Sequence, residues 1–282
     1  MKYTPVQPPE GINVSDEHPL KSFFILSAGT IGLVFGVLLI LSLVADFIVG
    51  YIPVEYERSL FENQNLGELI AGTEGETSAE VEAYLQQLVD SLHQQADNEY
   101  QDHQFKVSLS PMMEPNAFAA PGGHIIVTTG LLNSIESENG LAMVLAHEIG
   151  HHYERHPLRG MGRGIVVGLF LITLSGFDGA GLAESFLGQT TLIGQLAYSR
   201  KQETDADKIG VDLLTRHYQH ASGASEFFAY IEREGLHEHA PPAFLSTHPS
   251  PEKRLEYLSQ SEQQKPGKKT PLPQIVLDYI DT

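Results

Sequence analysis

The chain has 282 residues, with 36 aspartates and glutamates against 17 lysines and arginines and a formal net charge of -19. This charge excludes a nucleic acid as partner, because a protein that holds a phosphate backbone needs a basic surface. There is no cysteine, so the chain forms no disulfide and no thiolate metal site, and any metal must rest on histidines and carboxylates. With 41% hydrophobic residues, the composition is that of a folded protein, and the length allows one large domain or two small ones.

The first predicted element is an apolar helix. Phe23 to Ala45 are 23 consecutive uncharged residues, and a helix of that length spans roughly 34 Å, enough to cross a bilayer. A cleavable signal peptide would have a shorter apolar core and an A-x-A-like site, which Leu43-Val44-Ala45 fits poorly. A soluble core helix would carry a polar face, which this run lacks. The sequence therefore predicts an N-terminal tail over 1–22 and a lipid-contacting transmembrane anchor over 23–51.

The flanking charges indicate an orientation. Lys2 and Lys21 precede the span, and Arg58 follows it, so the positive-inside tendency favours a cytoplasmic N-terminus. The expected location is the cell (inner) membrane, crossed once, with the body of the chain on the extracytoplasmic, periplasmic side.

A linker and then a globular domain follow the anchor. Residues 52–77 are polar and without periodicity, which predicts a linker, and residues 78–262 are predicted to form one domain. Its first helix is expected to run from an N-cap at Ser78 to Ala96. Its apolar residues recur at helical spacing: Val81, Leu85, Leu88, Val89 and Leu92.

Two strands are expected next. Phe105 to Leu109 alternates like a half-buried strand, and a second strand, His124 to Thr129, is set off by the turn Pro121-Gly122-Gly123. The rest is mainly helical until residues 263–282, which predict a flexible tail, with docking in the cleft as an autoinhibitor left as the alternative. The predicted fold class is mainly α with a small β-sheet (α+β).

The motif with the clearest chemistry is H-E-x-x-H at 147–151. On a helix, His147 and His151 share one face and can present two imidazoles to one metal ion. Glu148 lies beside them and can take a proton from a water that the metal polarises. The alternative is a surface helix that happens to carry two histidines, and His152 and His156 add the hypothesis of a His-rich stretch that binds metal without catalysis.

Two histidines need a third protein ligand, which is expected on another helix. In the helix predicted from Arg200 to Leu214, Glu203 is the candidate ligand. Asp207, one turn later, is expected to accept a hydrogen bond from a ligating histidine. The small residues Ala206 and Gly210 on the same face predict close packing against the motif helix. The alternative is that these acids merely suit the helix dipole.

Several motifs together resemble the M48 family of zinc metallopeptidases over roughly Ser78 to Leu258. They are Asn116-Ala117-Phe118-Ala119-Ala120-Pro121-Gly122-Gly123, Gly130-Leu131-Leu132, Leu141 to His156, Arg200-Lys201-Gln202-Glu203 with Ala206-Asp207, and Thr247-His248-Pro249-Ser250-Pro251 with Arg254. The single anchor most resembles the Oma1-like and periplasmic bacterial members. The resemblance implies a gluzincin-type domain behind the anchor and one Zn2+ per chain.

The resemblance also implies roles for matching residues. His147, His151 and Glu203 would be the zinc ligands, Glu148 the general base, and His248 a catalytic group that stabilises the oxyanion. Asn116, Ala117, Phe118 and Ala119 fall on the edge strand that would bind an extended substrate. Gly140 departs from the family's acidic residue at the start of the motif helix, which is expected to loosen that start.

Two of these residues have alternative interpretations, and one further residue, Arg254, has an expected role. His248 precedes a proline and can simply form a turn, and Asn116 can cap the strand turn. Arg254 is expected to pair with a buried acid rather than to contact substrate.

A second apolar run, 164–177, lies between the two metal helices. A single membrane crossing there would place His147 and Glu203 on opposite sides of the bilayer. The run is therefore interpreted as a buried helix or as a lid that dips towards the membrane surface, with a membrane hairpin left open.

The sequence thus predicts a membrane-anchored zinc endopeptidase. From the resemblance, its substrates are expected to be unfolded or misassembled membrane and envelope proteins in extended conformation. The alternatives are a non-proteolytic, chaperone-like membrane-anchored binding protein with a structural metal site and a zinc amidase. Assembly into a homo-oligomer is left open.

Overall fold

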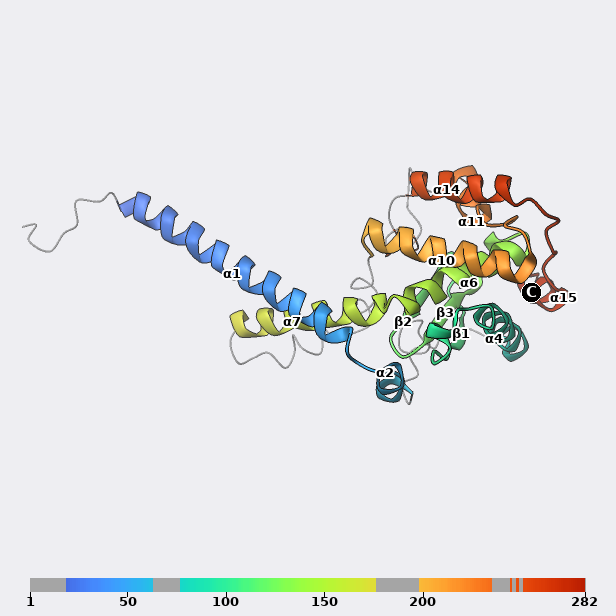
Figure 1. Ribbon diagram of the computed structural model, residues 1–282. Coiled ribbons are helices and arrows are strands. Elements are labelled where there is room, and N and C mark those ends of the chain that lie inside the picture. The colour runs from blue at the N-terminus through green and yellow to red at the C-terminus, as the bar shows by residue number, and fades with distance from the viewer. Residues whose placement is uncertain are drawn as a thin grey trace, which may run out of the picture.

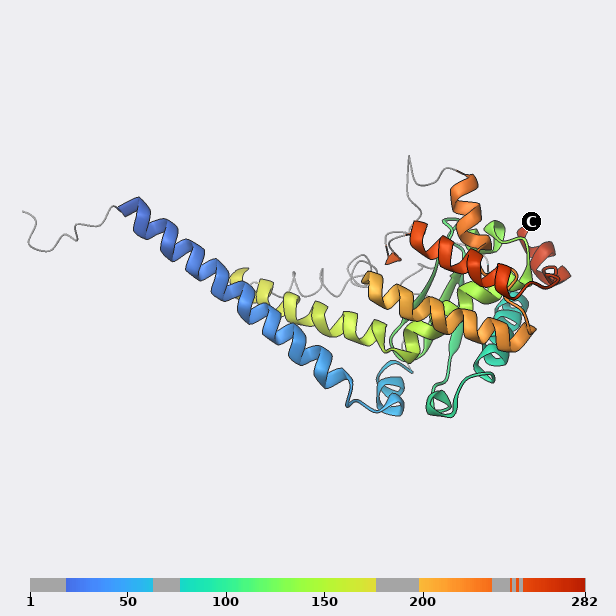
Figure 2. The same ribbon diagram turned by 45° about the horizontal axis from the view of Figure 1, so that its top comes forward.

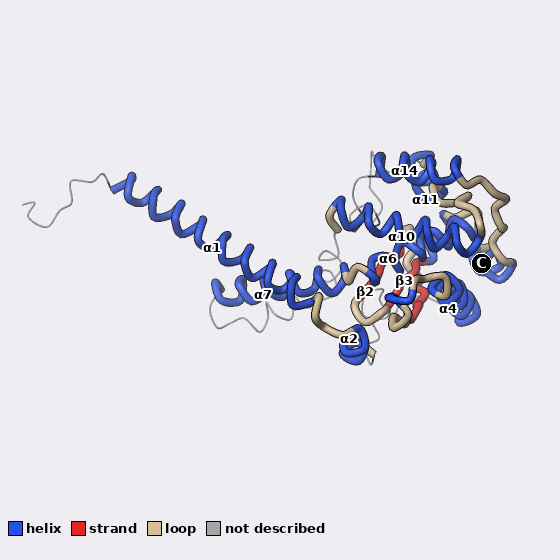
Figure 3. Tube along the Cα trace, in the orientation of Figure 1, coloured by secondary structure: helices blue, strands red, loops and turns tan. Residues whose placement is uncertain are grey.

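The computed structural model describes residues 19–62, 77–175, 198–234, 244, 247–248 and 251–281. The described chain is mainly helical, with one small sheet (Figures 1 and 3), which confirms the predicted fold class. The helices are α1 Pro19–Val49, α2 Val54–Phe61, α4 Ala79–His93, α5 Thr129–Ser134, α6 Glu138–Tyr153, α7 His156–Ser175, α10 Arg200–Tyr218, α11 Glu226–Arg233, α14 Pro251–Gln264 and α15 Gln274–Ile280. The strands are β1 Lys106–Ser110, β2 Ala117–Ala120 and β3 His124–Thr128.

The sheet has the order β1-β3-β2, with β1 parallel and β2 antiparallel to β3. Both predicted strands and the edge strand are therefore present. The turn between β2 and β3 has Gly122 and Gly123 at φ +82° and +86°, a region that favours glycine. Among the described residues, no strand pairs with the outer edge of β2.

The core forms where α4, the sheet and α6 meet. The five apolar residues predicted for α4 are all buried, and Ser78 caps the helix by accepting a hydrogen bond from the Val81 amide at 3.3 Å. The α6 helix is buried on nearly every side, because α4 and the sheet contact one part of it and α10 lies along another.

The two helices that carry the predicted ligands pack backbone to backbone. A Cβ atom built on Gly150 of α6 would lie 3.0 Å from the Ala206 carbonyl oxygen of α10, and one on Gly210 would lie 3.1 Å from the His147 amide nitrogen. The predicted close packing of the small residues on α10 is therefore confirmed. It brings both helices near enough for their side chains to meet over one point.

Helix α1 projects from the domain, and α7 runs beside it (Figures 1 and 2). In the part of the chain that the structure describes, α1 is the one helix long and apolar enough to span a membrane, and none of its most apolar window is buried. By length and composition it is an anchor or a signal sequence. In the part of the run 164–177 whose side chains the structure describes, Ile165 and Val167 on α7 are 46% and 40% exposed, so this part is not the buried helix that one prediction expected.

The predicted linker contains an ordered helix, α2, so the prediction of an irregular 52–77 was wrong for its first part. Glu57 on α2 is buried. Its carboxylate accepts a hydrogen bond from the Gly122 amide at 2.9 Å and pairs with Arg155 at 2.7 Å. These partners lie 65 and 98 positions further along the chain. The pattern of neighbouring residues therefore could not predict either contact. Residues 63–76 lie outside the described residues.

The C-terminal segment is ordered too, and the prediction of a flexible tail over 263–282 was wrong. Pro271 forms a β-bridge with Ser137, and the Tyr279 hydroxyl bonds the Thr129 hydroxyl at 2.9 Å. Val276 and Leu272 are buried in the main core. These contacts lie at the starts of α5 and α6, whereas the H-E-x-x-H motif lies near the end of α6. The segment therefore does not occupy the site as an autoinhibitor.

Candidate metal centre

The H-E-x-x-H residues lie in the second half of α6. Side-chain hydrogen bonds hold the N-terminus of this helix. Ser137 accepts a hydrogen bond from the Gly140 amide at 3.1 Å. The Glu226 carboxylate accepts from the Ser137 amide at 2.8 Å and fills the space where a side chain at 140 would lie. The expectation that Gly140 loosens this start was wrong, because an acid distant in sequence supplies the missing carboxylate.

Glu203 and Asp207 lie on the face of α10 that meets α6. This helix begins with a capping box, in which Ser199 and Gln202 each bond the other's backbone amide. Both acids are buried, at 1% and 2% exposure. The alternative was that they serve only to interact with the helix dipole, and such a role does not require burial against α6.

Four side chains offer donor atoms that all lie within 4.8 Å of one another: His147, His151, Glu203 and His248. The Nε2 atoms of His147 and His151 are 2.9 Å apart. They lie 3.6 and 3.5 Å from the Glu203 carboxylate. The three predicted ligands are thus brought together, and all are buried.

A second layer of charge surrounds the group. Asp207 Oδ1 lies 2.9 Å from His147 Nδ1, the nitrogen on the far side of the ring from the group. Arg254 donates two hydrogen bonds to Asp207, at 2.8 and 2.7 Å, and also pairs with Glu203. Arg254 therefore lies against buried acids, as predicted.

Glu148 is held at one oxygen and free at the other. The Ala119 amide on β2 donates a hydrogen bond to Oε2 at 2.8 Å. Oε1 is buried and has no hydrogen-bond partner among the described residues. Burial raises the pKa of Glu148, which suits a group that must accept a proton.

The ligand candidates differ in charge. Burial opposes ionisation of Glu203, but His248, His147 and Arg254 hold its pKa far below its usual range. Burial and Arg254 oppose protonation of His147, yet Asp207 and Glu203 raise its pKa to about 9. Burial and the neighbouring His147 lower the pKa of His151 well below its usual value. A metal that binds here requires the neutral form of His147.

His248 lies closer to the ligand group than an oxyanion-binding role alone requires. Its Nδ1 is 3.2 Å from both Glu203 carboxylate oxygens and 3.3 Å from His147 Nε2. Its Nε2 has no hydrogen-bond partner among the described residues and lies 3.6 Å from the free oxygen of Glu148. The Phe244 ring stacks on the imidazole with 4.3 Å between centroids. His248 is thus a candidate fourth donor as well as a neighbour of the base.

The predicted edge residues lie beside Glu148. The Thr128 amide donates to the Asn116 carbonyl at 3.1 Å, so Asn116 and Phe118 face β3 and the backbone groups of Ala117 and Ala119 face outwards. The Asn116 amide bonds the Thr128 hydroxyl at 2.9 Å, and the Asn116 side-chain oxygen is buried without a partner among the described residues.

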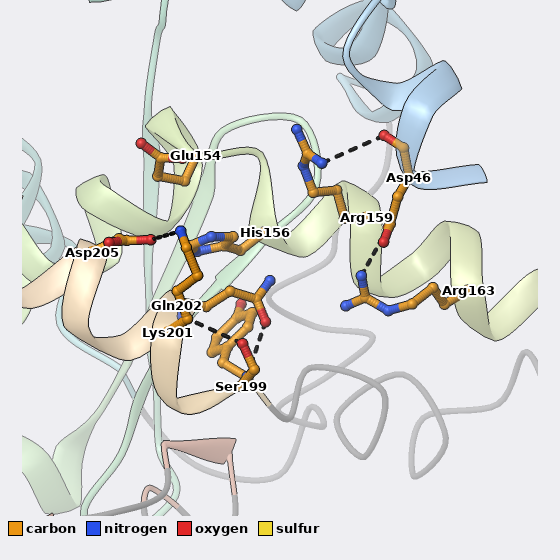
Figure 4. A pocket seen from close by; sticks show the side chains of 10 residues that line it. Asp46, Glu154, His156, Arg159, Arg163, Ser199, Lys201, Gln202 and Asp205 are labelled. Atoms are coloured by element: carbon orange, nitrogen blue, oxygen red, sulfur yellow. Dashed lines mark hydrogen bonds and ion pairs between the residues drawn. The ribbon is translucent and has the colours of Figure 1, made fainter. Parts of the chain in front are cut away.

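Two neighbours of His151 were not predicted from the sequence. His156 Nδ1 lies 2.9 Å from His151 Nδ1, and burial lowers the pKa of His156 to about 4. The Tyr198 ring stacks on His151 with centroids 3.8 Å apart. Both residues also line a polar pocket of about 610 Å³ between the end of α1, the start of α7 and the start of α10 (Figure 4). No motif in the sequence pointed to Tyr198. His156 was noted as one of several histidines near the motif, but its contact with a predicted ligand was not predicted.

The donor set fits zinc. Imidazole nitrogens and a carboxylate oxygen are usual zinc ligands, and three protein ligands with a nearby carboxylic base are typical of catalytic zinc sites. Here His147, His151 and Glu203 supply the donors, and Glu148 keeps one buried oxygen without a partner among the described residues.

Comparison with known proteins agrees with this geometry. The profile of peptidase family M48 matches residues 79–262. The mitochondrial metalloendopeptidase OMA1 of Schizosaccharomyces pombe is 35% identical over 148 residues, which cover 52% of this chain and 43% of that protein. The putative β-barrel assembly-enhancing protease of Vibrio cholerae is 32% identical over 149 residues, which cover 50% of this chain and 31% of that protein. The β-barrel assembly-enhancing protease of Escherichia coli K12 is 31% identical over 153 residues, 50% of this chain and 31% of that protein.

The chain therefore spans less than half the length of each of these relatives. The match of the family profile covers more than half of this chain and includes His147, Glu148, His151 and Glu203. The chain belongs to peptidase family M48.

Proposed function

We propose that this chain is a membrane-anchored, zinc-dependent endopeptidase that hydrolyses peptide bonds in unfolded or misassembled polypeptides. One observation carries the proposal. A buried carboxylate, Glu148, has a free oxygen next to three buried side chains that can hold one metal ion. A purely structural site has no use for such a base.

The residues divide the reaction between them. His147, His151 and Glu203 would hold the zinc, which when bound polarises a water molecule and the substrate carbonyl. Glu148 accepts the proton of the attacking water at Oε1, while the Ala119 amide keeps Oε2 in place. His248 Nε2, which lies 3.6 Å from Glu148 Oε1, would donate a hydrogen bond to the carbonyl oxygen as negative charge develops there.

The substrate is proposed to bind as an additional strand on β2. The outward amide and carbonyl of Ala117 and the outward carbonyl of Ala119 would pair with its backbone. Because backbone groups do the binding, unfolded chains should be preferred and sequence preference should be weak. The metal ligands and Glu148 are at most 2% exposed, so the residues that cover the site must move before a substrate enters. Strong cleavage of one folded protein with none of unfolded chains would contradict this mode of binding.

The proposed location is the cell membrane, with α1 as a single-pass anchor and the domain on its extracytoplasmic side. The support is the exposure of the apolar α1 side chains together with the charges of Lys2, Lys21 and Arg58 around it.

A second candidate, a non-proteolytic binding protein with a structural metal, rests on the fourth donor, His248. Four protein ligands make a closed site of the structural kind.

One experiment separates the two candidates. The full chain, purified in mild detergent without chelator, is assayed for zinc content and for cleavage of unfolded casein, beside Glu148→Gln and the exposed control Glu80→Gln on α4. We expect one zinc per chain in all three proteins and a rate lowered at least about 100-fold only in Glu148→Gln. Zinc in all three with cleavage in none would favour the binding protein instead.

A further inference from the structure

His156 is a buried histidine that the reaction proposed above does not use. It lies at the first position of α7 and is 4% exposed. Its Nδ1 atom is 2.9 Å from Nδ1 of His151, and the two rings meet edge to face at 65°. This contact lies on the side of the His151 ring away from the metal group, since His151 Nε2 is the atom near His147 and Glu203.

When His151 serves as a metal ligand, its contact with His156 is compatible with only one placement of the hydrogens on the two rings. A neutral imidazole that offers Nε2 to a metal carries its hydrogen on Nδ1. His151 therefore donates from Nδ1, and His156 accepts at Nδ1 and carries its own hydrogen on Nε2. Asp207 receives the corresponding Nδ1 contact from His147 at 2.9 Å. The two histidine ligands thus have different outer partners, a carboxylate for one and an imidazole for the other.

Residues that follow α1 in the chain hold the backbone just before His156. Arg155 has φ 58°, in the left-handed region that residues with a side chain rarely adopt. Its guanidinium bonds the Ile52 carbonyl at 2.9 Å and pairs with Glu57 at 2.7 Å. These contacts hold the corner between α6 and α7, and with it the place of the His156 ring.

We propose that His156 is a positioning residue: it fixes the tautomer and ring orientation of His151 and thereby slows loss of the metal. The inference rests on the zinc site of the proposed function, and it adds a residue that acts through a ligand. Outer partners of this kind typically change metal affinity about 10- to 100-fold when removed.

The chain offers a matched control in His152. This histidine is also 4% exposed, but its ring bonds the backbone carbonyl of His124 at 2.9 Å and meets the Phe105 ring edge to face, instead of bonding the ring of a proposed ligand. Replacing either ring by alanine removes the same side-chain atoms, at the end of α6 in one case and at the start of α7 in the other. A general loss of packing should therefore appear in both variants, and a loss of ligand orientation in only one.

The test uses the full chain in detergent, loaded with zinc, and follows the release of zinc to an excess of chelator. We expect His156→Ala to release zinc about 10 to 100 times faster than the wild type. His156→Asn, whose amide oxygen can accept the hydrogen bond, should recover much of the difference, and His152→Ala should stay within about twofold of the wild type. Cobalt-loaded His156→Ala should also show a shifted visible absorption spectrum, which a loss of packing elsewhere would not produce.

Release from His156→Ala at the wild-type rate would overturn the proposal, and so would equally fast release from His152→Ala. A wild-type chain that holds no zinc would overturn the metal site itself. The zinc content of the wild type, measured before chelator is added, therefore distinguishes the failure of the proposed function from the failure of this inference.

Discussion

Arg254 connects the two acids of α10, and it explains how both remain ionised without contact with water. It pairs with Asp207 and with Glu203, and all three side chains are at most 5% exposed. Buried carboxylates without partners would take up protons, and a protonated Glu203 would be a poor ligand. The guanidinium therefore supports the metal site by keeping the charge of a ligand, without being a ligand itself.

The catalytic role proposed for His248 leads to a prediction at this scale. His248→Ala should lower kcat for casein about 100- to 1000-fold, because a donor to the developing oxyanion is lost. The zinc content should stay at one per chain, because His147, His151 and Glu203 remain. Steady-state kinetics and metal analysis of the full chain check both parts.

The control for this variant is His217→Ala, near the end of α10 and outside the donor group. A His248→Ala enzyme as fast as the wild type, or faster, would contradict the prediction. It would indicate that His248 acts as a fourth ligand that blocks the site.

At the residue scale, the sequence predicted what depends on spacing within one helix. Two histidines four positions apart must share a helix face, and Glu203 and Asp207 were identified by the same rule. This rule could not predict the contact between His156 and His151. The two residues are five positions apart, and the backbone between them turns through the left-handed conformation of Arg155. Helical spacing does not extend through such a corner, and nothing in the composition indicates that it forms.

At the scale of helices, the metal group depends on how closely α6 and α10 approach. Gly150 and Gly210 allow backbone contact at this crossing, and Ala206 completes it. The stripe of small residues was visible in the sequence, so the close packing could be predicted. The contributions of α2 and α15 could not, because each makes its decisive contacts with residues far away in the chain.

Glu138 at the start of α6 ties together two other helices. Its carboxylate accepts hydrogen bonds from the Tyr84 hydroxyl of α4 at 2.9 Å and the Tyr218 hydroxyl of α10 at 2.7 Å. Burial and this carboxylate raise the pKa of both phenols above the ordinary value of 10.0. The folded chain therefore keeps both protons at a pH where the unfolded chain loses them.

This arrangement predicts how stability depends on pH. Above pH 10 the unfolded state binds fewer protons than the folded state, so the free energy of unfolding should fall as pH rises, by about 1.4 kcal/mol per pH unit for each tyrosine. Below pH 10 these two groups should have no effect on the slope. Urea unfolding of the full chain in detergent between pH 8 and 11, followed by circular dichroism, measures it.

The double variant Tyr84→Phe with Tyr218→Phe should be less stable at pH 8, by about 1.5 kcal/mol or more for each hydrogen bond lost to a charged acceptor. Its stability should then fall less steeply above pH 10. Tyr56→Phe, on an exposed phenol of α2, serves as control and should keep the wild-type slope. Equal slopes for the double variant and the wild type would contradict the role given to Glu138.

On the scale of the whole molecule, the domain is fastened to the end of α1 by basic residues of α7 and the corner before it. Arg163 pairs with Asp46 at 2.8 Å, and Arg159 bonds the Asp46 carbonyl at 3.4 Å (Figure 4). Arg155 bonds the Ile52 carbonyl, next to α2. These charges lie where the apolar part of α1 ends, as expected at a membrane surface. Beyond them, α7 continues beside α1. With α1 as the proposed anchor, the apolar half of α7 should lie at the same depth in the bilayer.

The absence of cysteine in the chain allows a direct test of this placement, because each single-cysteine variant has only one reactive thiol. Val37→Cys on α1, Val167→Cys on α7 and Tyr56→Cys on α2 all replace side chains that are at least 40% exposed. In right-side-out membrane vesicles, a membrane-impermeant maleimide should label Tyr56→Cys. The other two should react only after detergent is added, because lipid covers them. Labelling of Tyr56→Cys only in inside-out vesicles would reverse the proposed orientation, and rapid labelling of Val37→Cys in intact vesicles would show that α1 does not lie in the membrane.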